Sequence, residues 1–248
     1  MAADFFLFVC VGFLAQMVDG ALGMAYGVTA TSILLSFGTP PAVASASVHA
    51  AETFTTGASG FAHWRAGNVD RRAMVRLAVP GVVGGILGAV VLTSVPGDTI
   101  RPFVSAYLLI MGIVIVARAF RAVAERQLAD QPVTLLGLAG GFLDAIGGGG
   151  WGPIVTSRLI GAGAPPRFVI GSVNCAEFFV TAAISGAFLA TIGLELWPVI
   201  TGLIVGGVAA APLGALLAAR VPAKWLMLLV GALVIALSLY NLRTLVAG

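Results

Sequence analysis

Hydrophobic runs dominate the chain, and their lengths predict how it folds. A hydrocarbon core of about 30 Å takes ~20 helical residues to cross. Six apolar runs reach that length, at residues 41–62, 73–95, 100–118, 166–190, 196–219 and 224–243. Two further runs, 5–36 and 132–162, are longer than one span needs but shorter than two spans and a turn. We therefore expect six transmembrane helices and two segments of another kind.

Each of the two awkward runs carries a glycine-rich break near its middle. The first break is Asp-Gly-Ala-Leu-Gly at 19–23, and the second is Gly-Gly-Gly-Gly-Trp-Gly-Pro at 147–153. Glycine and proline disfavour a continuous helix, so we predict broken segments that enter and leave the membrane on one side. Irregular backbone at that depth is tolerated only inside protein or along a wet cavity. The breaks are therefore candidate functional sites.

The two halves of the chain repeat the same unusual residues. The matched pairs are Gly20 and Gly23 with Gly149 and Gly152, then, after a four-residue deletion, the Gly-x-Pro-Pro motifs at 38–41 and 163–166, Ser47 with Ser172, His49 with Asn174, Glu52 with Glu177, and Thr56 with Thr181. We expect a first transmembrane repeat at 1–121, a cytoplasmic linker at 122–131 and a second repeat at 132–248. A broken hairpin plus three helices crosses the membrane an odd number of times, so the second repeat would be inverted.

Charge is scarce and unevenly placed. Only 9% of residues are charged and 59% are hydrophobic, against roughly 25% charged in soluble domains, which excludes a soluble enzyme and a nucleic-acid binder. Placing the 63–76 loop in the cytoplasm puts eleven of the thirteen basic residues on that side and leaves Arg101 and Arg243 outside. The positive-inside rule then predicts that both termini lie outside. Cys10 and Cys175 lack metal-site spacing and are predicted to be small core residues.

Four acids fall inside the apolar segments: Asp19, Glu52, Asp144 and Glu177. Acids in a membrane interior are rare and are functional candidates by default. Glu52 and Glu177 each follow the first proline of a Pro-Pro helix start by twelve residues, or about 18 Å of helix, which is near mid-membrane. We assign all four acids as candidates for coupling to an ion. Asp19 and Asp144 lie near the breaks at positions that do not align, so capping of a helix or docking of a hairpin is the alternative for them. For the two glutamates, the alternative is that they cap N–H groups of the broken helices.

Polar residues follow one face of the helices that carry the two glutamates. Ser45, His49, Glu52, Thr56 and Ser59 share a helical face, and Asn174, Glu177 and Thr181 echo it. We expect the two stripes to line one central cavity, with His49 and Asn174 contacting substrate. Alternatively, the hydroxyls bond their own helix and the histidine is a packing residue.

The glycine breaks suggest how a small anion could be held. A helix that restarts at mid-membrane presents unpaired N–H groups and a positive dipole end, and the restarts are expected near Met24 and Ile154. An oxyanion could bind there without a buried Arg or Lys. The candidate substrate contacts are Gly20, Gly23, Met24, Gly148, Gly149, Gly150, Trp151 and Gly152. The alternative is that glycine only permits close helix packing.

These motifs resemble the sulfite exporter TauE/SafE family over nearly the whole chain. The resemblance rests on Asp19-Gly20-x-x-Gly23, Gly149-x-x-Gly152-Pro153, the two Gly-x-Pro-Pro starts and the repeated glutamates. It implies a bacterial inner-membrane transporter that exports, or sometimes takes up, sulfite, sulfoacetate and related small organosulfur anions. The first break lacks the glycine run of the second, so the two half-sites are expected to differ.

The sequence therefore predicts an all-α polytopic membrane protein of two inverted repeats, acting as a secondary transporter of a small sulfur-containing oxyanion by alternating access. No cofactor, metal site or catalytic residue is expected, and the partners are the anion and the lipid bilayer, with a homodimer left open. Transport of a cation or metal ion through the buried acids is the main alternative. An intramembrane hydrolase using Asp19 with Asp144, or Ser59 with His63, ranks last because no hydrolase motif surrounds these residues.

Overall fold

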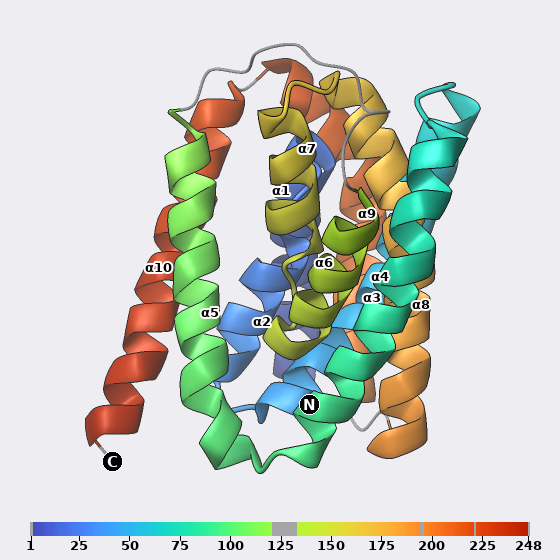
Figure 1. Ribbon diagram of the computed structural model, residues 1–248. Helices are drawn as coiled ribbons and strands as arrows, with labels where there is room; N and C mark the ends of the chain where they lie inside the picture. Colours follow the sequence, from blue (N-terminus) through green and yellow to red (C-terminus); the bar gives the residue numbers. More distant parts are fainter. Residues whose placement is uncertain (1, 121–132, 194–195, 221, 248) are drawn as a thin grey trace.

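The computed structural model describes residues 2–120, 133–193, 196–220 and 222–247, and the regular elements in them are helices (Figure 1). In chain order these are α1 (Ala2–Leu22), α2 (Tyr26–Ser36), α3 (Pro41–Arg65), α4 (Arg71–Ser94), α5 (Gly97–Arg118), α6 (Val133–Gly147), the π-helical turn η2 (Gly152–Thr156), α7 (Ser157–Gly161), α8 (Pro166–Thr191), α9 (Trp197–Arg220) and α10 (Ala223–Ala247). The expected linker at 122–131 lies outside the described residues.

The six predicted spans coincide with α3, α4, α5, α8, α9 and α10. Four helices among the described residues are long and apolar enough to cross a membrane, at Arg71–Ser94, Gly97–Arg118, Pro166–Thr191 and Lys224–Leu245. Shorter apolar helices occur in α1, α2, α6 and α9. α3 is also long, but it carries the polar stripe. The protein is therefore an all-helical polytopic membrane protein.

The two broken runs fold as hairpins that point toward each other. α1 and α2 are joined by residues 23–25, and the Phe8 and Phe37 rings lie 6.3 Å apart, so this hairpin starts and ends at the lower end of the bundle in Figure 1. α6 descends from the upper end, and η2 and α7 return to it (Figure 1). Each break thus lies at the inner tip of a hairpin.

Long helices surround the two hairpins. α1 packs along α9, α6 along α4, α3 along α8, and α5 along α10. The α5–α10 contact is close because glycines face it: a Cβ on Gly112 would lie 2.9 Å from the Ile235 side chain. Both Pro-Pro starts are where the sequence predicts them, since α3 begins at Pro41 and α8 at Pro166.

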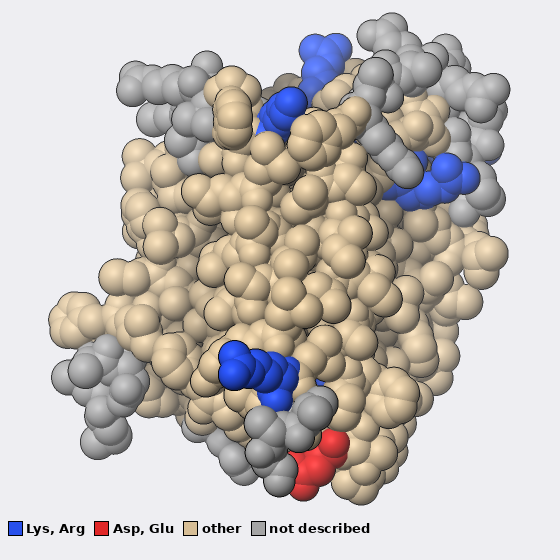
Figure 2. Space-filling view, turned by 90° about the vertical axis from the view of Figure 1, so that its left-hand side faces the viewer, with Lys and Arg blue, Asp and Glu red and all other residues tan. Residues whose placement is uncertain are grey.

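The two ends of the bundle differ in charge. Basic residues at the upper end, on helix ends and the turns between them, are Arg65, Arg71, Arg72, Arg76, Arg118, Arg158, Arg167 and Lys224. The lower end has Arg101, in the first turn of α5, and Arg243 near the end of α10. Both chain termini are marked at this lower end in Figure 1. Figure 2 shows a broad belt without charged residues between the ends.

One expectation about the core is wrong. Cys175 is buried, as predicted, but Cys10 is exposed on the outside of the bundle. An apolar run around a cysteine does not distinguish a protein core from a lipid-facing surface, because both are apolar.

Candidate functional site

The two breaks meet in the middle of the molecule and exchange hydrogen bonds. The Thr31 hydroxyl of α2 donates to the Gly148 carbonyl in the second break. The Thr156 hydroxyl of η2 donates to the Gly23 carbonyl in the first break, over 3.2 Å. Each break therefore satisfies a carbonyl that the other leaves without a helical partner.

Glycines let the two backbones touch. A Cβ on Gly27 would lie 2.6 Å from the Gly149 Cα, and a Cβ on Gly152 would lie 2.6 Å from the Met24 Cα. Gly149 also has a φ of +140°, a conformation that side chains rarely allow. The glycines thus allow close packing, and they bring the two helix restarts together.

A buried aspartate caps each restart. The Asp19 carboxylate accepts the Tyr26 N–H at 3.4 Å, and the Asp144 carboxylate accepts the Trp151 N–H at 2.9 Å. Both spacings are seven residues, which puts Asp19 and Asp144 in equivalent places. Carboxylates suit a helix N-terminus because they take up an orphan donor and oppose the positive dipole end.

This geometry corrects the register that the sequence analysis gave the breaks. There Asp19 was matched to Gly148, and Gly23 to Gly152. In the structure Gly23 and Gly148 are equivalent, with φ of +65° and +66°, and the offset between the halves is the same 125 residues that relates Glu52 to Glu177. The deletion inferred from glycine matching is not needed.

The restarts also lie two residues from their predicted places, in opposite directions. α2 begins at Tyr26 rather than at Met24, and η2 begins at Gly152 rather than at Ile154. Ala25, with a φ of +97°, is the last residue before α2. Proline at the second position of η2 fits a helix start, because its missing N–H has no intrahelical partner there.

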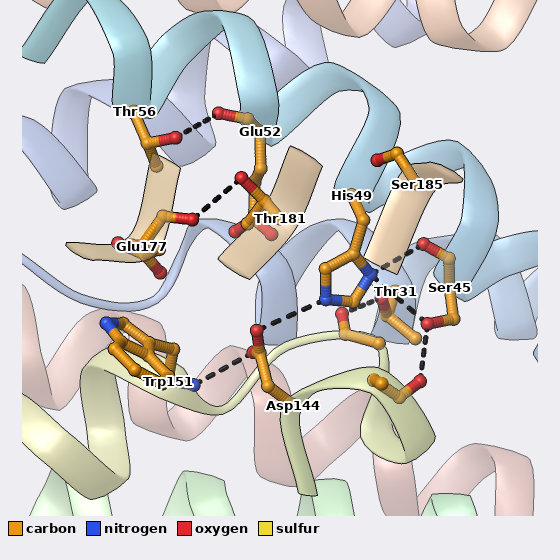
Figure 3. Close-up of polar contacts among 12 residues, drawn as sticks. Thr31, Ser45, His49, Glu52, Thr56, Asp144, Trp151, Glu177, Thr181 and Ser185 are labelled. Carbon is orange, nitrogen blue, oxygen red and sulfur yellow. Dashed lines mark hydrogen bonds and ion pairs between the residues drawn. The ribbon is translucent and has the colours of Figure 1, made fainter. Parts of the chain in front are cut away.

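We call the region where the two breaks meet, with Asp19 and Asp144, the centre. The two glutamates reach it from the crossing helices α3 and α8. Glu52 and Glu177 are 4% and 8% exposed, and they extend toward the segment that holds Asp144 and Trp151 (Figure 3). A Cβ on Gly27 would lie 2.9 Å from Glu52 Oε1, so this carboxyl group borders the first turn of α2. Glu52 Oε2 is buried with no hydrogen-bond partner in the described residues.

His49 joins the centre through Asp144. Its Nε2 lies 3.3 Å from Asp144 Oδ2, and its Nδ1 lies 2.8 Å from the Ser45 carbonyl oxygen. Ser45 Oγ donates to the Ala145 carbonyl at 2.6 Å, which ties α3 to α6 (Figure 3). His49 and Asp144 are almost fully buried.

Three predicted site residues lie apart from this centre or turn away from it. The Asn174 amide donates to Ser59 Oγ at 2.9 Å, so it bridges α8 and α3. Gly20 lies within α1, before the break. The buried Trp151 side chain packs against Gly81 of α4, and its Nε1 donates to the Val173 carbonyl at 3.4 Å, so its backbone is what faces the centre.

The sequence analysis missed several polar groups at the breaks. Arg118 ends a predicted span and was counted only as a basic residue on the cytoplasmic side, but its guanidinium reaches Ser157 Oγ and lies 3.7 Å from Met24 Sδ. The buried hydroxyl of Tyr107 lies against Gly150 without a hydrogen-bond partner in the described residues. A basic residue at the last position of a predicted span was the signal that could have pointed to Arg118.

The centre therefore combines restarting helices with ionisable side chains. Glu52 is within electrostatic range of Asp19 and Asp144, and Glu177 is within range of all three other acids. Among the residues that the structure describes, no three His, Cys, Asp or Glu side chains converge as the ligands of a metal ion would. Such a centre can offer N–H donors to an anion and carboxyl groups to protons.

Comparison with known proteins identifies the family. The model of the sulfite exporter TauE/SafE family matches residues 8–241. The probable membrane transporter protein YtnM of Bacillus subtilis (strain 168) is 42% identical over 97% of this chain and 82% of its own length. The probable membrane transporter protein ORF9 of Sinorhizobium sp is 26% identical over 90% of this chain and 82% of its own length.

No solved structure matches this chain. The family and these relatives are membrane transporters rather than enzymes, so the hydrolase alternative is set aside. The described helices agree with a protein that crosses a membrane several times. The chain belongs to the sulfite exporter TauE/SafE family of membrane transporters.

Proposed function

We propose that this protein is a secondary transporter that exports a small sulfur-containing oxyanion, such as sulfite or sulfoacetate, through a site where the two breaks meet. The observation that carries the proposal is the pair of facing helix restarts in the middle of the bundle, enclosed by four buried acids. The name of the family supports the substrate class.

The anion would bind to backbone N–H groups at the restarts. The first-turn N–H groups of a helix have no carbonyl one turn earlier to bond. Asp19 and Asp144 occupy one such group each, and Glu52 accepts the Gly27 N–H, which leaves those of Val28 and Gly152 in the first turns. These donors favour an oxyanion with several acceptor oxygens over a monoatomic anion.

The buried acids make anion binding depend on protons. At about 5 Å and an effective dielectric constant of about 20, one ionised carboxylate repels a unit anion by ~3 kcal/mol. Several ionised acids beside the substrate would prevent binding, so we propose that protons occupy these groups when the anion is bound. The ionisable groups facing the centre are Asp19, Glu52, Asp144, Glu177, His49, Tyr26 and Tyr107.

His49 and Asp144 support such a role because their contact requires a proton. The Ser45 carbonyl oxygen can only accept, so the hydrogen-bond network places a proton on His49 Nδ1, which donates to this oxygen. Nε2 then faces a carboxylate oxygen at 3.3 Å. Two acceptors would repel at this distance, so a proton must reside on one of them, which makes the pair a candidate proton carrier.

We propose that the chain consists of two inverted repeats, 1–121 and 132–248. Two kinds of contact support this. Thr31 and Thr156 lie 125 residues apart and make equivalent hydrogen bonds, as do Asp19 and Asp144. The packing of α1 along α9 also corresponds to the packing of α6 along α4. The basic upper end would face the cytoplasm of a bacterial inner membrane, with both termini outside. Alternating access would then expose the centre to each side in turn.

Flux through reconstituted liposomes tests this function. Wild-type protein is expected to accumulate sulfoacetate or sulfite when a pH gradient is imposed, and Glu52→Gln to lose at least about tenfold of the gradient-driven part, as expected when an essential proton acceptor is removed. Asp98→Asn, an exposed acid in the first turn of α5, is the matched control. Equal flux in Glu52→Gln and wild type would overturn the coupling role of Glu52. Flux of Na⁺ or a divalent ion without anion flux would overturn the substrate class in favour of a cation.

A further inference from the structure

Three buried polar side chains lie outside the centre, between α2 and the α5–α10 pair. Ser105 of α5 and Ser238 and Asn241 of α10 are each 0% exposed. Ser105 Oγ, Ser238 Oγ and Asn241 Oδ1 have no hydrogen-bond partner within the part of the chain that the structure describes. Serine in a membrane helix usually bonds the carbonyl one turn earlier, and these two do not. A buried polar group left unpaired is destabilising, so these positions call for a ligand.

Helix packing brings the three residues to one level. α5 and α10 run in opposite directions, because Gly112 lies against Ile235 while Gly231 lies against Val116. Continuing this register toward the lower end places Ser105 beside the turn that holds Ser238 and Asn241. The Asn241 amide also donates to the Ser32 carbonyl of α2 at 3.4 Å. We call Ser32, Ser105, Ser238 and Asn241 the polar seam.

The polar seam connects the lower end of the bundle with the breaks. At its lower end, Arg101 lies one turn before Ser105 on α5; its Nη2 donates to the Leu35 carbonyl at 3.0 Å, and its Nε has no partner in the described residues. At its inner end, Ser32 follows Thr31, whose hydroxyl donates to Gly148 in the second break.

We propose that the polar seam is the path by which the anion passes between the centre and the lower end of the bundle. This inference rests on the proposed function. Hydroxyl and amide groups donate to anion oxygens, the seam residues include no acid, and the Arg101 guanidinium attracts anions at the opening. Since the seam residues are buried, the path is closed in this structure and opens when α2 separates from α10.

Cysteine labelling tests the path directly. In a Cys10→Ser, Cys175→Ala background, Ser105→Cys and Ser238→Cys are treated with methanethiosulfonate ethylsulfonate, a thiol reagent that is itself a sulfonate, from the lower side of sealed vesicles. Lipid-facing Ile113→Cys and Leu239→Cys, at positions 52% and 51% exposed, are the matched controls. We expect the seam cysteines to react at least about tenfold faster than the controls, because thiols react as hydrated thiolates, and sulfoacetate to slow them.

The outcomes separate this path from the proposed function. Seam cysteines that do not react while the background protein still transports sulfoacetate would overturn the path alone. Seam cysteines that react in a protein that carries no sulfur oxyanion would support a water-accessible path and overturn the proposed substrate. Ser238→Leu adds a test that needs no label: it is expected to lower flux at least about tenfold by filling the seam while affinity for sulfoacetate in detergent stays within about twofold. Unchanged flux in Ser238→Leu would contradict the path.

Discussion

Replacing Asp144 by alanine should destabilise the protein more than any other single change at the breaks. The carboxylate accepts the buried Trp151 N–H at 2.9 Å and contacts His49 at 3.3 Å. An orphaned buried N–H costs about 1–3 kcal/mol, and a hydrogen bond that involves a charged group contributes about 1.5–3 kcal/mol. Asp144→Ala is therefore expected to lower the free energy of unfolding by about 2.5–6 kcal/mol.

Two other variants separate the contribution of the backbone cap from that of the contact with His49. Asp144→Asn keeps an acceptor for the Trp151 N–H, and its amide can donate to a neutral His49, so the expected loss is under about 1.5 kcal/mol. Asp19→Ala removes a longer hydrogen bond, 3.4 Å to the Tyr26 N–H, and no described histidine contacts that carboxylate. Its expected loss is about 1 kcal/mol.

Steric trapping in bicelles measures these unfolding free energies without leaving the lipid environment. The expected order of destabilisation is Asp144→Ala first, with Asp19→Ala and Asp144→Asn well below it. If Asp144→Ala lay within about 0.5 kcal/mol of wild type, the aspartate would not be holding the second break. Equal losses in Asp144→Ala and Asp144→Asn would assign the effect to charge rather than to the backbone cap.

Two further changes probe the contact between the breaks and the upper end. Gly149→Ala should cost about 1–3 kcal/mol and abolish flux, because a φ of +140° strains alanine and its Cβ would lie 2.6 Å from the Gly27 Cα; Gly161→Ala, with open space around it, should match wild type in the same unfolding assay. Arg118→Gln should raise the KM for sulfoacetate presented at the upper end about tenfold, the equivalent of one charge-assisted hydrogen bond. Exposed Arg158→Gln is its control, and an equal rise for both would reduce Arg118 to a bulk surface charge.

The sequence predicted the helices well because length and glycine content decide them. Apolar runs of membrane-spanning length became α4, α5, α8 and α10, and the two overlong runs broke where glycine and proline disfavour helix. The buried acids were also found, since a charge in an apolar run is conspicuous. These features depend on residues that are neighbours along the chain, so a single sequence is enough to predict them.

Contacts between distant segments could not be predicted in the same way. Asp19 and Asp144 were placed at unmatched positions because glycines were aligned first, and four consecutive glycines can be aligned in more than one register. The register follows from the aspartate caps, which are hydrogen bonds to backbone N–H groups. Every residue except proline has such a group, so the sequence does not mark which one is capped. The contact of Arg118 with Ser157 was not predicted, because the sequence does not tell where a long side chain at a helix end will point.

The exchange between Thr31 and Thr156 bears on how the protein is made. The chain enters the bilayer from its N-terminus, so the first hairpin arrives while the residues that complete its tip are still unsynthesised. Until Thr156 emerges, the Gly23 carbonyl lacks the donor that it has in the finished protein. The early half must therefore wait in the membrane with an unfinished tip, where it is exposed to quality-control proteases. Severed halves made together in one cell should protect each other from degradation, whereas either half made alone should be short-lived.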